Sequence, residues 1–252
     1  MTKGNAVTVA DFRDMLNIAA PFDTAEPWDN VGLLVGREDA VVTRVMTALD
    51  ITSGVVKQAA EWNAQLIVSH HPVIFKPVSC LKSDQPAYLL AQHGLSAICA
   101  HTNFDRAQAG VNDMLAAMLQ LKDVHPSQDE KCRIGEIGWP VASSDFAAAV
   151  KKMTGAQMVQ YIDGGRMINT VAVCAGAGGD ELSALSEADA LVTGELKHNE
   201  WLEAAATGKT VIAAGHYATE VRAAQILCDI LRTAFPHVEI RAAKENYPYS
   251  VI

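Results

Sequence analysis

Two adjacent histidines, His70 and His71, follow a short apolar run at residues 65–68 and precede Pro72. The run is rich in branched aliphatic residues, which is typical of a buried strand, and the proline ends it. Because neighbouring side chains of a strand point to opposite faces, both imidazoles can serve one site only if the chain turns there. With such a turn, the two imidazoles could bind two metal ions that lie side by side. The alternative, which the dipeptide alone favours, is one histidine in the core and the other on the surface.

A second pair, His216 and Glu220, is separated by four positions. If a helix begins near His216, this spacing brings the two side chains within roughly 40° in azimuth and about 6 Å along the axis. An imidazole and a carboxylate so placed could chelate one ion or hold two neighbouring ions. Gly215 would permit a tight turn from strand into helix. The ordinary alternative is a surface contact between residues one helical turn apart.

Polar side chains of this kind recur directly after the carboxyl ends of expected strands. Ligands bind at that edge in open α/β sheets, so segments that are distant in the sequence could meet there. The residues that follow this rule are His70, His71, His101, Asp105, Glu195 and His216.

The expected ligands, three imidazoles and two carboxylates, suit two metal ions better than one. A single catalytic zinc with an open position takes three protein ligands, and no cysteine lies in these motifs. A pair of ions can lower the pKa of a shared water and polarise a substrate. We therefore expect two divalent ions per chain, with Zn, Fe, Mn and Co all open, and assign His101 and Glu195 to orienting ligands or to proton transfer. The expected ligands are His70, His71, Asp105, His216 and Glu220.

Strand-like runs that alternate with helical patterns must position these side chains. This alternation predicts an α/β fold with largely parallel sheets flanked by helices. Strands are expected at 41–49, 65–69, 95–100, 158–162, 170–175, 190–193 and 210–214, and helices at 9–19, 53–62, 86–94, 111–121, 144–155 and from 216 to about 235.

The periodicity fails at residues 122–134, where almost every residue is polar or turn-forming. We place a domain boundary there. An N-terminal α/β domain at 1–126 would carry the paired histidines and Asp105, and a C-terminal α/β domain at 127–252 would carry the Gly-His-x-x-x-Glu ligands. The metal site is expected between the two halves, at the carboxyl ends of strands.

Composition narrows the class of partner and the compartment. The chain has 252 residues, half of them hydrophobic, and a formal charge of -9. Without a basic run, a nucleic-acid partner is not expected, and the acidic surface disfavours anionic membranes. Five scattered cysteines fit free thiols in a reducing compartment. With no apolar signal core at Met1–Asn5 and no membrane-spanning run, we expect a cytoplasmic protein.

Five short motifs occur in order along nearly the whole chain. They are Glu26-x-Trp28-Asp29-Asn30-x-Gly32-Leu33, Ser69-His70-His71-Pro72, His101-Thr102-Asn103-x-Asp105, Thr193-Gly194-Glu195 and Gly215-His216-Tyr217-x-Thr219-Glu220. In this combination the chain resembles the Nif-three-like dinuclear-metal proteins, often labelled GTP cyclohydrolase I type 2 homologues. The absence of a long insertion makes it similar to the compact bacterial members.

The resemblance implies two α/β domains, a toroidal homohexamer and a two-metal site that faces its cavity. Some members of the family have aspartate where Glu195 stands, so the resemblance does not define the role of that residue. The metal ligands that it implies are His70, His71, Asp105, His216 and Glu220.

These observations support a two-metal hydrolase acting on a small polar substrate, and the resemblance implies a nucleotide, with attack at a purine ring as in GTP cyclohydrolase. The alternative is a hexamer that binds metal without turnover and acts as a carrier or regulatory assembly. A nucleic-acid-processing enzyme would need a positively charged channel, which the composition does not favour. The glycines at 176–179 could bind a phosphate or form a plain strand-to-helix turn, and Lys197 and His198 fit an exposed helix start.

Overall fold

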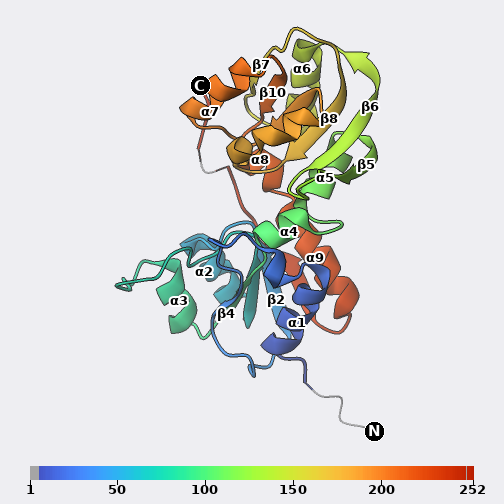
Figure 1. The fold of residues 1–252 in the computed structure, drawn as a ribbon. Helices are drawn as coiled ribbons and strands as arrows, with labels where there is room; N and C mark the ends of the chain where they lie inside the picture. Colours follow the sequence, from blue (N-terminus) through green and yellow to red (C-terminus); the bar gives the residue numbers. More distant parts are fainter. Residues whose placement is uncertain (1–5, 248) are drawn as a thin grey trace. The chain divides into compact units, whose positions relative to one another are not determined.

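The computed structural model describes residues 6–247 and 249–252. The chain forms two compact units, each built around its own sheet (Figure 1). The first unit comprises the described residues of Met1–Ala107 together with Arg222–Asn246, and the second comprises Gln108–Val221 and the described residues of Tyr247–Ile252. The expectation that Met1–Asn5 lack a signal core concerns residues outside those described.

The sheet of the first unit has five strands among the described residues. In spatial order they are β1 (Gly32–Val35), β4 (Ser96–Cys99), β3 (Leu66–Ser69), β2 (Arg44–Ala48) and β11 (Glu239–Ala242). β4, β3, β2 and β11 pair in parallel, and only the edge strand β1 is antiparallel. The predicted largely parallel α/β arrangement is therefore confirmed for this unit.

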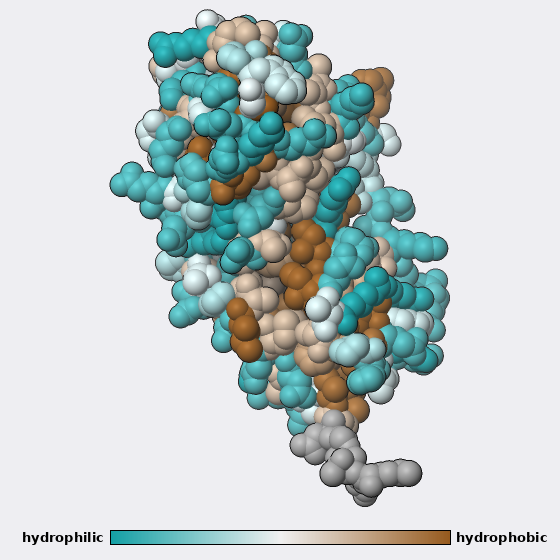
Figure 2. All heavy atoms as spheres, turned by 90° about the vertical axis from the view of Figure 1, so that its right-hand side faces the viewer, coloured by the Kyte–Doolittle hydropathy of each residue, from teal (hydrophilic) through white to brown (hydrophobic). Residues whose placement is uncertain are grey.

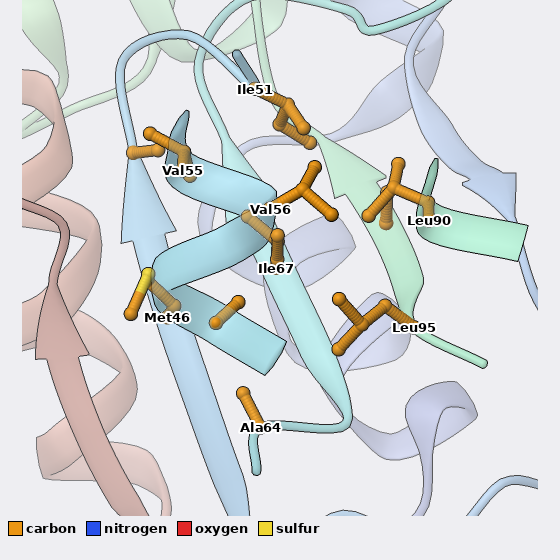
Figure 3. Packing of buried hydrophobic residues seen from close by; sticks show 11 residues of the cluster. Met46, Ile51, Val55, Val56, Ala64, Ile67, Leu90 and Leu95 are labelled. Carbon is orange, nitrogen blue, oxygen red and sulfur yellow. The ribbon is translucent and has the colours of Figure 1, made fainter. Parts of the chain in front are cut away.

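Helices of the first unit follow the local signals in the sequence. Helix α2 begins after Thr52, whose hydroxyl accepts a hydrogen bond from the Val55 backbone N–H at 3.2 Å. In Figure 3 the side chains of α2 pack over strands β2 and β3, which contribute Met46 and Ile67 to a buried apolar cluster. Burial of these apolar side chains stabilises strands β2 and β3 and so holds in place the residues that follow their carboxyl ends. The helices are α1 (Val9–Ala19), η1 (Phe22–Thr24), α2 (Ser53–Glu61), α3 (Pro86–Gln92), α4 (Thr102–Arg106) and α9 (Ala223–Ala234).

The sheet of the second unit is mixed. Across the described residues its strands run β5 (Lys122–Pro126), β6 (Arg133–Val141), β8 (Ile168–Cys174), β9 (Ala190–Thr193), β10 (Thr210–Ala213) and β7 (Gln160–Ile162). Only β8, β9 and β10 are mutually parallel. The helical segments are α5 (Val111–Met118), α6 (Ser143–Thr154), η2 (Gly178–Ser186), α7 (His198–Ala206) and α8 (His216–Glu220).

The two units divide the chain differently from the predicted boundary between residues 126 and 127. The expected linker forms β5 and the start of β6, which pair as an antiparallel hairpin. All five residues of β5 are exposed, so this edge strand lacks the alternation of apolar and polar residues that reveals a half-buried strand. The chain then returns to the first unit, because β11 pairs in parallel with β2.

The helix expected from residue 216 to about 235 is two helices. Helix α8 ends at Glu220 and α9 begins at Ala223, and the division between the units falls between Val221 and Arg222. Apolar residues continue through the break, so the sequence reads as one amphipathic segment.

No helix in the described part of the chain has the length and apolar character needed to cross a membrane. On the face drawn in Figure 2, hydrophobic residues form separate patches within a largely hydrophilic surface. Scattered apolar side chains of this kind are normal on protein surfaces.

Candidate metal centre

Three histidines converge at the carboxyl ends of two neighbouring strands in the first unit. His70 and His71 follow β3, and His101 follows β4, which is parallel to β3. The ring centroids lie 5.0 Å apart for His70 and His71, 5.2 Å for His70 and His101, and 5.5 Å for His71 and His101. One ring nitrogen of each lies within 4.8 Å of the other two. Both adjacent histidines therefore belong to one cluster, in which His70 is fully buried and the side chain of His71 is 21% exposed.

Each of these three imidazoles is held through Nδ1 by an oxygen acceptor. Because the acceptors are a carbonyl and two carboxylates, Nδ1 donates the proton, and the neutral ring carries its lone pair on Nε2. This is the tautomer that metal-binding histidines with an oriented partner use. The bonds run from His70 to the Ala100 carbonyl (3.0 Å), from His71 to Asp50 Oδ1 (2.8 Å) and from His101 to Asp29 Oδ1 (2.9 Å).

Asp105 lies beside this cluster, as expected. It is part of α4, and its Oδ1 atom is 3.5 Å from His70 Nε2. A carboxylate and an imidazole at this separation can bind the same cation. His101 offers a third imidazole to the same group, so it can act as a ligand as well as an orienting or proton-transfer residue.

Sequence reasoning did not find the carboxylate that orients His101. The side chain of Asp29 is fully buried and also accepts hydrogen bonds from the Thr102 backbone N–H at 3.1 Å and the Thr102 hydroxyl at 2.6 Å. Burial raises the pKa of Asp29, but the bonds from His101 and Thr102 outweigh it and hold the pKa well below its ordinary value. Asp29 therefore stays ionised and fixes the ring of His101.

Replacing Asp29 by asparagine is expected to lower the free energy of unfolding by about 1–3 kcal/mol, because the single amide oxygen cannot accept all the bonds that the two carboxylate oxygens accept from His101, Thr102 and Asn30. The lowered pKa of Asp29 gives this stabilisation a defined pH dependence. It is fully present above the ordinary pKa of aspartate and is lost as the pH falls through the lower pKa of the folded state. Urea unfolding at several pH values should therefore show the two proteins converging in acid.

The matched control is Asp39→Asn, which removes an exposed carboxylate that pairs with Arg37. We expect this change to alter stability by less than about 0.5 kcal/mol. An Asp29→Asn protein as stable as the control at neutral pH would contradict the role given to Asp29.

Asp50, the partner of His71, was also missed. It follows β2 after Leu49, so it obeys the same strand-end rule that selected the histidines. Its side chain is about half exposed, at 49%, and that of His71 is 21% exposed. The position of Asp50 after a strand is therefore visible in the sequence. Its distance along the chain from His71 follows no rule that would identify the two residues as partners.

The second unit contains the other expected ligands. Helix α8 begins at His216 immediately after Gly215, which has a φ of +93° and makes the turn from β10. His216 Nε2 lies 2.9 Å from Glu220 Oε2, and His216 Nδ1 lies 3.1 Å from Glu195 Oε1. The Glu220 side chain is only 4% exposed. The spacing of four thus brings His216 and Glu220 together, and Glu195 orients the imidazole from its other nitrogen.

The glycine-rich turn at 176–179 does not have the form of a phosphate cradle. The Gly176 amide donates to the Thr219 hydroxyl at 3.1 Å, and the Gly178 amide donates to the Thr193 hydroxyl at 2.9 Å. A side chain at position 176, where φ is +66°, would overlap the Glu220 carboxylate. This turn therefore holds α8 and leaves room for Glu220.

Replacing Gly176 by alanine is expected to weaken metal binding by about 10- to 100-fold, the range for residues that position metal ligands. The added methyl group must displace the Glu220 carboxylate. Competition with a chromogenic chelator measures the change. Gly208→Ala is the control, because Gly208 has nearly the same φ, +65°, and a Cβ atom there meets nothing within 4 Å. Equal metal affinity in the two variants would rule out this function of Gly176.

A cavity of about 130 Å³ adjoins His216 and Glu195 in the second unit. Tyr247 and Tyr249 contribute to its lining, and burial raises the pKa of Tyr247. Lys197 pairs with Glu200 at 2.8 Å at the start of α7, so it forms part of an exposed helix start, as expected.

Comparison with known proteins covers almost all of the chain. The family model described as Duf34/NIF3 (NGG1p interacting factor 3) matches residues 7–248. A Campylobacter jejuni protein named GTP cyclohydrolase 1 type 2 homolog is 30% identical over 249 residues, which cover 96% of this chain and 99% of that protein.

Staphylococcus aureus supplies two further comparisons. A protein named GTP cyclohydrolase 1 type 2 homolog is 48% identical over 119 residues, or 46% of this chain, and that stretch spans about a third (32%) of the relative's length. The crystal structure of a hypothetical protein from S. aureus has a TM-score of 0.86 at 30% identity and covers 98% of this chain and 100% of that one. The motif resemblance is thus confirmed, and the chain belongs to the Duf34/NIF3 family.

Proposed function

We propose that this protein is a dinuclear-metal hydrolase that acts on a small, nucleotide-like substrate. The observation that carries the proposal is that each of three clustered histidines has its Nδ1 atom held by an oxygen acceptor, while one ring nitrogen of each lies within 4.8 Å of the others. The proposed ligands of the two divalent ions are His70, His71, Asp105, His216 and Glu220.

The donor types support a pair of borderline metal ions. Imidazole and carboxylate ligands suit Zn, Fe, Mn and Co, whereas a site for Ca or Mg would consist of oxygen ligands alone. The first unit supplies mainly imidazoles, and the second supplies one imidazole and the buried Glu220 carboxylate. We propose that both sets serve the same two ions, since neither set alone offers enough donors for two.

The ions would supply a hydroxide at neutral pH and polarise a substrate oxygen. The residues of the chain would do the rest. Asp29, Asp50 and the Ala100 carbonyl hold the imidazoles in one orientation, and Glu195 does the same for His216. Glu195 is 60% exposed, so it could also exchange a proton with water or with a bound substrate.

The nucleotide class is supported by the names of two relatives, each called a GTP cyclohydrolase 1 type 2 homolog. The test is to load the protein with zinc, manganese, iron or cobalt and measure turnover of nucleotides and simple phosphoesters. We expect the metal-loaded protein to hydrolyse at least one nucleotide and the metal-free protein to hydrolyse none. A protein that binds metal, transfers it to an acceptor and turns over none of these substrates would support the carrier alternative instead.

A further inference from the structure

Two exposed aromatic side chains border the histidine cluster of the first unit. Trp28 is 58% exposed and Phe75 is 44% exposed. Their ring centroids are 5.8 Å apart with an interplanar angle of 47°. They come from different loops, one before β1 and the other after His71. Single exposed apolar residues need no explanation, but two in contact at the edge of a candidate site do.

Both rings contact the same imidazole. The centroid of His101 lies 6.3 Å from that of Trp28 and 6.4 Å from that of Phe75, with interplanar angles of 72° and 75°. His101 in turn lies edge-on to His70. The aromatic pair, Trp28 and Phe75, is thus continuous with the group of nitrogens that we propose as metal ligands.

Hydrogen bonds hold the two loops in place. The Asn30 side chain donates to the Ile74 carbonyl at 2.5 Å, which ties the loop of Trp28 to that of Phe75. The Asn30 backbone N–H donates to Asp29 Oδ1 at 2.7 Å, and Asp29 is the buried partner of His101. The aromatic pair is therefore pre-organised relative to His101, which reduces the entropic cost of binding a ligand there.

We propose that the aromatic pair binds the planar heteroaromatic ring of the substrate, such as a purine, by stacking. This inference rests on the proposed hydrolase function and names the part of the substrate that the site recognises. A flat, polarisable ring can stack on indole and phenyl faces whatever its substituents, whereas a phosphate has no face to stack and ribose has no π-system. The position beside His101 would bring an edge of the ring towards the histidine cluster.

The test compares guanosine 5′-monophosphate with ribose 5-phosphate, which lacks the ring, by calorimetry on metal-loaded and metal-stripped protein. Trp28→Ala should weaken binding of the nucleotide by roughly 5- to 150-fold, the range for loss of one aromatic stacking partner. Trp28→Phe should retain part of the affinity, and ribose 5-phosphate should bind equally weakly to every variant. Metal content should be the same in Trp28→Ala and in the wild type.

Trp139→Ala is the control, because Trp139 is 67% exposed and belongs to β6 of the second unit. Equal nucleotide affinity in Trp28→Ala and Trp139→Ala would overturn the proposal. Equal binding of the two probes by the wild type would also overturn it. A change in the oligomeric mass of Trp28→Ala would do the same, because it would show that a second copy of the chain covers the aromatic pair. Ring-dependent binding that persists in protein unable to retain metal would support the stacking site while contradicting the metal-dependent function.

Discussion

Replacing His71 by alanine is expected to reduce the metal content from about two ions per chain, as in dinuclear sites, to one or fewer. His71 supplies an imidazole that Asp50 orients at 2.8 Å, and alanine removes the donor without emptying a large part of the core, because the side chain is 21% exposed. Metal analysis after dialysis measures the loss. Thermal unfolding of the metal-free proteins should differ little between the variant and the wild type.

The matched control is His125→Ala, which removes an exposed imidazole from β5. Its metal content should equal that of the wild type. If His71→Ala retains as much metal as this control, His71 is not a ligand and the cluster at the ends of β3 and β4 has another purpose.

The second large effect is expected for Glu220→Gln. The glutamine has nearly the same shape and can still bond to His216, but it removes the negative charge that a divalent ion requires from this buried position. We expect metal affinity to fall by at least about 100-fold, beyond the usual loss for an orienting residue. Titration with zinc in the presence of a competing chelator measures it.

Stability gives an independent readout for this variant. Because the glutamine can keep a hydrogen bond to His216 and fills the same space, metal-free Glu220→Gln should unfold close to the temperature of metal-free wild type. Glu203→Gln, an exposed change on α7, controls for the loss of one negative charge. Zinc affinity that falls equally in both variants would show a general charge effect in place of a ligand role for Glu220.

The strands that carry the site could be predicted because both faces of each are buried. β3 is a short apolar run followed at once by His70, β9 is one followed by Gly194 and Glu195, and every residue of each strand is buried. The pattern therefore indicates where each strand ends, and the candidate site residues are the polar residues that come next in the chain. The exposed edge strand β5 has no such pattern, so its sequence predicts a linker where the structure has a strand.

Tertiary contacts account for what the sequence could not show. Asp29 and His101 are 72 positions apart, and no spacing rule links a buried carboxylate in a loop to an imidazole after a distant strand. The return of β11 to the first sheet likewise depends on pairing with β2, nearly 200 residues earlier. Local periodicity contains no information on such pairings, so neither the division into units nor the orienting carboxylates can be predicted from it.

The central proposal is that ligands from both units bind one pair of ions. Crystals of the zinc-loaded protein, measured at the zinc absorption edge, would test it most directly through anomalous difference maps. We predict two peaks per chain a few ångströms apart, with His70, His71 and Asp105 on one side and His216 and Glu220 on the other. Peaks bound by residues of one unit alone, or no peak beside the paired histidines, would contradict the account.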